Sequence, residues 1–252
     1  VSVSEIRQSY SKEKARNDSI AHAWTYYCLR PISFYITPFI IKLGFSANAF
    51  TVFGLIPLSI GMYYIFNGHV STSNYIVGAV FINIWYLFDS VDGNIARFKK
   101  EVSKKGVIID WMVGMAYHIS LPICLGISLF LGEGDVQIVF LGYIFNSEIW
   151  LLLGIIKLLA ELLREITSLG SKNLLGTKIS SVPTGDKINF IDILPRAVLS
   201  FEIPLLLIAA LFGNIYLKVF LLFYTVYNIM TFVAMVYLSI KKAIFLDKKP
   251  TQ

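Results

Sequence analysis

Three aspartates, Asp89, Asp92 and Asp110, lie within some of the most apolar sequence of the chain. A carboxylate in such surroundings is costly unless a cation or hydrogen-bond donors hold it. Asp89 and Asp92 are three residues apart, so on a helix their side chains lie one above the other on one face. Carboxylate oxygens are ligands that Mg²⁺ and Mn²⁺ prefer. The spacing therefore predicts a divalent-metal site formed by the three aspartates.

Small residues and one arginine accompany these aspartates: Gly93, Ala96, Arg97 and Gly106. Glycine and alanine permit a ligand to approach the backbone closely, and the planar guanidinium of Arg97 fits phosphate oxygens. Magnesium commonly binds proteins through a few carboxylates together with substrate phosphates. The pattern favours a pocket for a nucleoside diphosphate. The alternative is that the aspartates only pair with basic neighbours at a membrane interface, which would not require this fixed array.

Composition places these residues in a membrane. The chain has 252 residues, of which 56% are hydrophobic and 15% charged, and its mean hydropathy is +0.67. A soluble domain is rarely so apolar. The net charge of +6 does not indicate a nucleic-acid partner, because the basic residues cluster between apolar segments rather than in one patch. Cys28 and Cys124 are far apart in sequence and predict neither a disulfide framework nor a metal site.

The elements that would position the aspartates are long apolar runs. We expect an all-α membrane protein with six transmembrane helices and an N-terminal interfacial amphipathic helix. The expected spans are about 47–66, 74–97, 106–131, 137–156, 193–212 and 215–240. Residues 19–44 are rich in aromatics, but their longest uncharged run is too short to cross a bilayer, so an interfacial helix fits them better.

The distribution of lysine and arginine predicts the orientation. Basic residues gather after the second span, between the fourth and fifth spans, and in the C-terminal tail, whereas only Lys218 falls near the opposite face. By the positive-inside rule, both termini and the aspartate site face the cytoplasm. We expect three regions: residues 1–45 as a cytosolic tail with the interfacial helix, 46–242 as the membrane domain, and 243–252 as a cytosolic tail.

The array D-x-x-D-G-x-x-A-R-x8-G-x-x-x-D, which begins at Asp89, resembles the signature of the CDP-alcohol phosphotransferase family. Members of this family are integral membrane enzymes that make phospholipids and related phosphodiesters. The resemblance implies transfer of a substituted phosphate from a CDP-linked donor, such as CDP-diacylglycerol or another CDP-alcohol, to an acceptor alcohol, with release of CMP. It also implies dependence on Mg²⁺ or Mn²⁺ and suggests a homodimer.

The resemblance further implies roles for individual residues. The three aspartates would hold metal, with Asp110 also catalytic, and the small residues and the arginine of the array would frame the cytidine diphosphate. Asn48 and Thr51 share a face at the start of the first span. By themselves they fit a polar helix entry, but the family places an asparagine and a hydroxyl residue near this point against the nucleotide.

One signature position differs. The family's array ends in a further aspartate, thought to be a metal ligand and the catalytic base, and this chain has Gly114 there. Three explanations are open: the acceptor needs no strong base, another residue substitutes for the aspartate, or the protein is catalytically silent. His118 lies on the same helix face as Asp110 and Gly114 and is a candidate proton acceptor. Its alternative role is a structural hydrogen bond to Glu148 or Glu202.

A candidate for acceptor binding is Arg196, near the cytoplasmic end of the expected fifth span. It would hold an anionic acceptor such as a phosphorylated alcohol, or else extend to lipid head groups or pair with Asp192. The sequence predicts a metal-dependent phosphotransferase. The alternative is a silent family member that binds nucleotide or acts as a membrane scaffold. A transporter would require polar residues along a transmembrane path, whereas the strongest constellation lies at one face.

Overall fold

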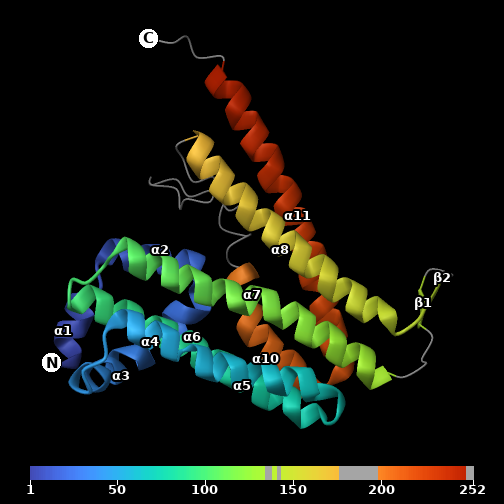
Figure 1. Cartoon of the computed structure of the whole chain (residues 1–252), viewed down its shortest axis with the longest axis horizontal. Coiled ribbons are helices and arrows are strands. Elements are labelled where there is room, and N and C mark those ends of the chain that lie inside the picture. Colours follow the sequence, from blue (N-terminus) through green and yellow to red (C-terminus); the bar gives the residue numbers. More distant parts are fainter. Residues whose placement is uncertain (134–137, 141–142, 176–197, 248–252) are drawn as a thin grey trace.

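The computed structural model describes residues 1–133, 138–140, 143–175 and 198–247, and these are almost entirely helical (Figure 1). The chain begins with short helices α1 (Val3–Gln8) and α2 (Lys12–Ala21), a π-helical turn (Thr25–Leu29) and α3 (Arg30–Lys42). Helices α4 (Ala47–Phe53) and α5 (Leu55–Phe66) then continue one another, and a 3₁₀ turn (Asn67–His69) leads to α6 (Thr72–Phe98).

The second half begins with α7 (Lys104–Glu133), the longest helix that contributes to the aspartate site. Two short strands follow, β1 (Ile138–Phe140) and β2 (Tyr143–Phe145), and then α8 (Glu148–Leu175), α10 (Glu202–Phe212) and α11 (Asn214–Asp247). Helices α8 and α11 pack along each other, while α4 to α7 form the group that carries the aspartates (Figure 1).

Serine side chains fix several helix starts. Ser2 and Glu5 form a capping box at α1, Ser11 caps α2, and Ser46 accepts a hydrogen bond from the backbone N–H of Ala49 at 3.2 Å at the start of α4. Such caps satisfy backbone donors that have no partner within the helix. The cap at Ser46 confirms the start predicted for the first span.

Two helix pairs approach closely because glycines remove side chains from their crossings. A Cβ atom added at Gly78 of α6 would lie 2.8 Å from the carbonyl oxygen of Gly61 in α5. One added at Gly154 of α8 would lie 2.4 Å from the carbonyl oxygen of Pro122 in α7. Small residues at such crossings are typical of membrane helices. The two crossings link α5 to α6 and α7 to α8.

Among the described residues, four helical segments are long and apolar enough to cross a membrane: Ala47–His69, Thr72–Phe98, Lys104–Gly132 and Asn214–Ile244. They correspond to the first, second, third and sixth predicted spans. The all-α prediction is confirmed apart from one short hairpin, but six spans are not. Only the second part of the predicted fifth span lies within the described residues, as the 11-residue helix α10.

The fourth span was predicted as a helix over residues 137–156, and for the first part of this range that prediction is wrong. Residues Ile138–Phe140 pair with Tyr143–Phe145 as antiparallel strands, and α8 begins only at Glu148. The run is rich in β-branched and aromatic residues and contains a glycine, which also suits a hairpin. A short apolar run cannot distinguish strand from helix by periodicity alone. From Glu148 the predicted helix continues well beyond residue 156.

Helix α3 has the two faces expected of an interfacial helix. Ser33, Phe34 and Thr37 are buried against the rest of the chain, whereas large apolar side chains such as Tyr35 and Phe39 are exposed. Exposed aromatics are typical of helices that lie at the membrane–water boundary. Its position at a membrane surface stays a prediction.

Candidate functional site

The three aspartates converge from two helices. Helix α6 carries Asp89 and Asp92 within its last three turns, and α7 carries Asp110 in its second turn. One carboxylate oxygen from each residue lies within 4.8 Å of the other two. Asp92 is only 6% exposed, Asp89 is half-buried, and Asp110 is open to the cavities described next. Three oxygens so close in a largely buried setting fit the hard-ligand preference of Mg²⁺ or Mn²⁺.

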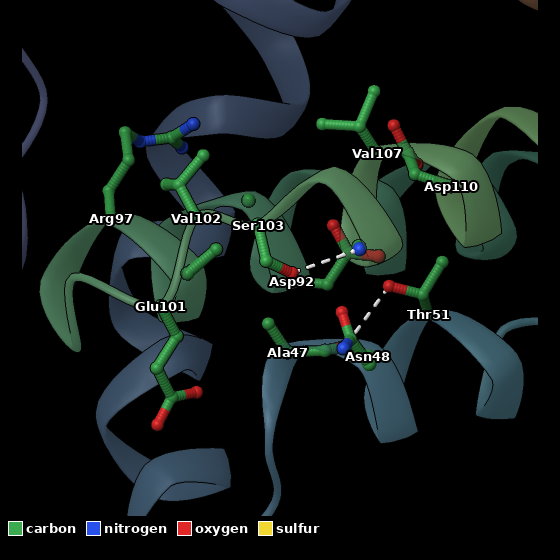
Figure 2. Close-up of a pocket in the computed structure, with 13 residues that line it drawn as sticks. Ala47, Asn48, Thr51, Asp92, Arg97, Glu101, Val102, Ser103, Val107 and Asp110 are labelled. Carbon is green, nitrogen blue, oxygen red and sulfur yellow. Dashed lines mark hydrogen bonds between the residues drawn. The ribbon is translucent and has the colours of Figure 1, made fainter.

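A cavity of about 180 Å³ opens beside the aspartates, between α4, α6 and α7 (Figure 2). Asp92 and Asp110 line it, so it adjoins the carboxylate cluster directly. Its walls also include the loop between α6 and α7. The cavity brings together all the residues predicted to bind nucleotide: Asn48, Thr51, Gly93, Ala96, Arg97 and Gly106.

Gly106 lets the start of α7 lie close to the side chain of Asn48 in α4. A Cβ atom at Gly106 would lie only 2.8 Å from the side-chain oxygen of Asn48, a distance that real Cβ contacts do not show. The backbone N–H of Gly106 donates to the hydroxyl of Ser103 at 3.1 Å. The hydroxyl of Thr51 donates to the carbonyl of Ala47 at 3.0 Å, as drawn in Figure 2. These contacts set the shape of the cavity opposite Asp92.

Arg97 is held over this cavity by its neighbours. Its guanidinium folds back toward Gly93, where an added Cβ would lie 3.2 Å from one terminal nitrogen. The other terminal nitrogen donates to the side-chain oxygen of Asn94 at 2.8 Å. The guanidinium carbon also lies 5.4 Å from the ring centre of Tyr10, a cation–π distance. Arg97 is thus fixed in place by contacts that do not use all its donors.

Tyr10 also contacts a second arginine, which sequence reasoning did not single out. The guanidinium carbon of Arg30 lies 5.1 Å from the same ring. Arg30 is buried and donates to the carbonyl of Ser90 at 2.9 Å and to the carboxylate of Asp18 at 3.3 Å. These contacts join positions up to 60 residues apart, so no local spacing could have indicated them.

Asp18 is the anionic centre of this N-terminal contact. It is 2% exposed, accepts a hydrogen bond from the Tyr10 hydroxyl at 2.7 Å, and pairs with Lys14 at 2.9 Å. Burial alone would raise its pKa, but the hydrogen bonds from Lys14 and Tyr10 and the charges of Lys14 and Arg30 hold the pKa of Asp18 below its usual value. Burial, with the hydrogen bond to Asp18, raises the pKa of Tyr10. The ionised carboxylate of Asp18 therefore joins α2 to Arg30 of α3, and Arg30 in turn contacts α6 through the carbonyl of Ser90.

A second cavity, of about 440 Å³, opens on the other side of the aspartates. Asp89 and Asp110 line it, as do Arg30, Gly114 and His118. Asp110 borders both cavities, and a narrow gap lined by all three aspartates lies between them. The carboxylate cluster therefore lies where two chambers meet.

Gly114 leaves open space at this junction. A Cβ atom built there meets nothing within 4 Å, in contrast to Gly106. The backbone conformation of Gly114 does not require glycine either, since it lies in the middle of α7 and has no positive φ. The position has room for a larger side chain.

A comparison with known protein families agrees with this geometry. The family model of CDP-alcohol phosphatidyltransferases matches residues 45–239. The chain belongs to the CDP-alcohol phosphatidyltransferase family. A search of curated proteins found no match to the chain. Membership implies a transferase of phospholipid synthesis that uses a CDP-alcohol donor and an alcohol acceptor and generally depends on a divalent metal. The four long apolar helices suggest a multi-pass membrane protein.

The buried ionisable residues of this family member differ in part from the predicted set. His118 lies 3.7 Å from Glu161, measured from Nδ1 to Oε2, and Glu202 belongs to the same group. Glu148 instead is exposed in the first turn of α8, so the predicted contact between His118 and Glu148 is wrong. Glu161 was missed because the sequence suggested that α8 had already left the membrane there.

The position of one predicted site residue is not described by the structure. Arg196, the candidate for acceptor binding, falls in the segment 176–197, outside the described residues. Its role stays a prediction, as does that of Asp192 as its partner.

Proposed function

We propose that this family member transfers a substituted phosphate group from a CDP-linked donor to an acceptor alcohol and releases CMP. The observation that supports this proposal most directly is the convergence of Asp89, Asp92 and Asp110 between two cavities. A transfer between two substrates needs both of them to reach one reacting centre from different sides. The two cavities meet this requirement at the aspartates.

The aspartates would hold Mg²⁺ or Mn²⁺. The separation of their oxygens, within 4.8 Å of one another, suits shared coordination. A bound ion would polarise the phosphorus under attack and offset the negative charge of the departing CMP. Burial of Asp92 beside it, at 6% exposure, lowers the local dielectric and strengthens such an interaction.

The first cavity would hold the cytidine diphosphate. Arg97 contributes guanidinium donors for phosphate oxygens, and Gly93, Ala96 and Gly106 let the ligand approach the helix backbones. Asn48 offers both a donor and an acceptor to the nucleotide. The hydroxyl of Thr51 already donates within its own helix and so is left as an acceptor.

The second cavity would hold the acceptor. Its walls carry the cationic Lys14 and Arg30 and carboxylates that include Asp89 and Asp110, together with aromatic side chains. The charged groups favour a hydroxyl compound or its phosphorylated form over a hydrocarbon chain. Arg196 remains the candidate for an additional anion contact.

We place both termini and the two cavities on the cytoplasmic side. The support is the sequence rule on basic residues, because the loop between α6 and α7 that borders the first cavity carries several lysines. Assembly as a homodimer is expected from the family resemblance.

The competing proposal is a protein that binds nucleotide without turnover, or that serves as a membrane scaffold. It is motivated by Gly114, because the resemblance assigns the catalytic base to this position. It predicts that CDP binds in a metal-dependent manner while no CMP is formed.

Both proposals can be tested on the full chain in lipid nanodiscs. CMP release would be measured for a panel of CDP-alcohols and candidate acceptors, with Mg²⁺, Mn²⁺ or EDTA, and CDP binding would be measured by calorimetry. We expect release only with metal, and loss of release and of metal-dependent binding in Asp92→Asn. The exposed carboxylate of Glu13 provides the matched control, Glu13→Gln.

The outcomes separate the alternatives. Binding without release in the natural chain, together with release in Gly114→Asp, would show that the protein is silent because the base is missing. Absence of both binding and release with every donor would refute the nucleotide site itself.

A further inference from the structure

A second group of ionisable residues lies behind the second cavity, where α7, α8 and α10 meet. The ammonium of Lys157 lies 2.5 Å from Oε1 of Glu161 and 2.8 Å from Oε1 of Glu202. Lys157 and Glu161 are 1% exposed and Glu202 is 3% exposed. His118 lies at the edge of this group, with Nδ1 at 3.7 Å from Oε2 of Glu161.

This group does not need a metal ion. His118, Glu161 and Glu202 have ligand atoms within 4.8 Å of one another, but the ammonium of Lys157 already contacts both carboxylates. Two carboxylates and one ammonium leave one negative charge in a buried site. Such a charge is costly unless another cation balances it. This charge would stabilise the imidazolium that forms when His118 receives a proton during the reaction.

His118 is placed to exchange protons with the second cavity. Its Nδ1 is buried and has no hydrogen-bond partner. Oε2 of Glu161, which lies opposite it, is also buried and without a hydrogen-bond partner. The side chain is nevertheless 33% exposed and lines the cavity beside Asp110 and Gly114. The open part of the ring is therefore its other edge, which carries Nε2.

We propose that His118 is the proton acceptor of the transfer reaction and that Glu161 positions it, an inference that rests on the function proposed above. A carboxylate that accepts the Nδ1–H bond keeps Nε2 free as the base and stabilises the imidazolium that forms. The present separation of 3.7 Å is longer than a hydrogen bond. Catalytic hydrogen bonds are often long before substrate binds and shorten in the complex.

The step balances as follows. The acceptor oxygen forms a bond to the phosphorus that bears the donor's alcohol, and the bond from this phosphorus to the oxygen bridging to CMP breaks. The electron pair of the broken bond leaves with CMP. The hydroxyl proton moves to Nε2 of His118, and the imidazolium then releases it to water in the cavity. Asp110 is less suited to this task, because in the proposed site its carboxylate is engaged by the metal.

The other residues of the group hold the carboxylate of Glu161 in place. Lys157 contacts Glu161 and Glu202 together, and the side-chain amide of Asn228 donates to Oε1 of Glu161 at 3.3 Å. These contacts occupy Oε1 and leave Oε2 directed toward His118. The arrangement fixes the carboxylate without consuming the oxygen that the histidine needs.

Kinetics of variants test the proposal. We expect His118→Ala to lower kcat by about 10²- to 10³-fold while the KM for the CDP-linked donor changes by less than about twofold. Glu161→Gln should lower kcat by about tenfold and have little further effect in the His118→Ala background, since the two residues act as one unit. The matched control is Glu148→Gln, which changes an exposed carboxylate on the same helix.

Two rescue experiments separate a lost base from a lost fold. Exogenous imidazole should restore activity to His118→Ala. Gly114→Asp in the same background should restore it too, because a side chain at Gly114 meets open space in the same cavity. CDP binding, measured in parallel, should be unchanged in His118→Ala and in Glu161→Gln.

A spectroscopic measurement does not depend on activity. The chain has three histidines, so ¹⁵N-labelled histidine gives a spectrum simple enough to assign by substitution. We expect the neutral ring of His118 to carry its proton on Nδ1 in the natural chain, and Glu161→Gln to shift the population toward the Nε2–H tautomer.

The proposal is overturned if His118→Ala retains the natural kcat, or if its lost activity returns with neither imidazole nor Gly114→Asp. A tautomer population that is unaffected by Glu161→Gln would remove the positioning role. Failure of the natural chain to release CMP with any donor would instead reject the proposed function on which the inference rests.

Discussion

Replacing Lys157 by methionine should destabilise the protein more than almost any other single change to a charged residue. Methionine matches the unbranched shape of lysine but carries no charge. The substitution leaves Glu161 and Glu202 buried, at 1% and 3% exposure, without the ammonium that contacts both. Two carboxylates in the same buried site then repel each other as well.

The size of the effect follows from the distances. At 2.5 and 2.8 Å, each ion pair contributes about 6 kcal/mol of Coulomb energy at an effective dielectric constant of about 20. Desolvation of the three ions offsets most of this gain. Removing the ammonium of Lys157 leaves the desolvation cost of the two carboxylates without compensation. We therefore expect Lys157→Met to lower the free energy of unfolding by about 3–5 kcal/mol. The midpoint temperature should fall by on the order of 10 °C.

Unfolding of the full chain in mixed micelles, followed by tryptophan fluorescence during titration with SDS, measures this change. Lys241→Met, which removes an exposed lysine of α11, provides the control and should stay within about 0.5 kcal/mol of the natural chain. Adding Glu161→Gln and Glu202→Gln to Lys157→Met should recover most of the loss. A loss below about 1 kcal/mol in Lys157→Met would refute the description of the site as a buried, mutually dependent charge group.

Three further outcomes are expected. Gly154→Ala should cost about 1–3 kcal/mol in the same unfolding assay, because its Cβ would lie 2.4 Å from the backbone of α7, whereas Gly170→Ala, which meets nothing within 4 Å, should not destabilise. Gly106→Ala should weaken CDP binding by tenfold or more in calorimetry, since its Cβ would displace the side chain of Asn48 at 2.8 Å. Asp18→Asn should destabilise by about 1–3 kcal/mol at pH 7. Because the folded pKa of Asp18 lies below its ordinary value of 3.8, its contribution is present above that value and is lost as the pH falls through the folded pKa, so the difference in thermal midpoint should shrink as the pH is lowered below 3.8.

The aspartate constellation was predictable from sequence because it depends on short-range geometry. A spacing of three residues places Asp89 and Asp92 on one face of α6, and a short basic loop brings the start of α7 back beside them. That Gly93, Ala96, Arg97 and Gly106 line one cavity followed from the same array, since glycines at fixed spacing indicate where backbones approach. The start of the first span was set by a local signal as well, the cap at Ser46.

The contacts that sequence reasoning missed are long-range. Tyr10 lies between two arginines from different helices, which no pattern in the N-terminal residues encodes. Lys157 and Glu161 are four residues apart, a spacing typical of ion pairs on exposed helix surfaces. The packing of α7, α10 and α11 against α8 turns this ordinary pair into a buried group. The hairpin after α7 was missed because its apolar residues suit a strand as well as a helix.

The contact of Tyr10 with Arg30 and Arg97 bears on how the protein is cut for experiments. The family match begins at residue 45, yet Lys14, Asp18 and Arg30, which line the second cavity, come before it. A fragment trimmed to the matched region would keep Asp89, Asp92 and Asp110 but lose Lys14, Asp18 and Arg30 from the wall of that chamber, and with Tyr10 the ring that contacts Arg97. A fragment intended for study of the second cavity should therefore include α1 to α3.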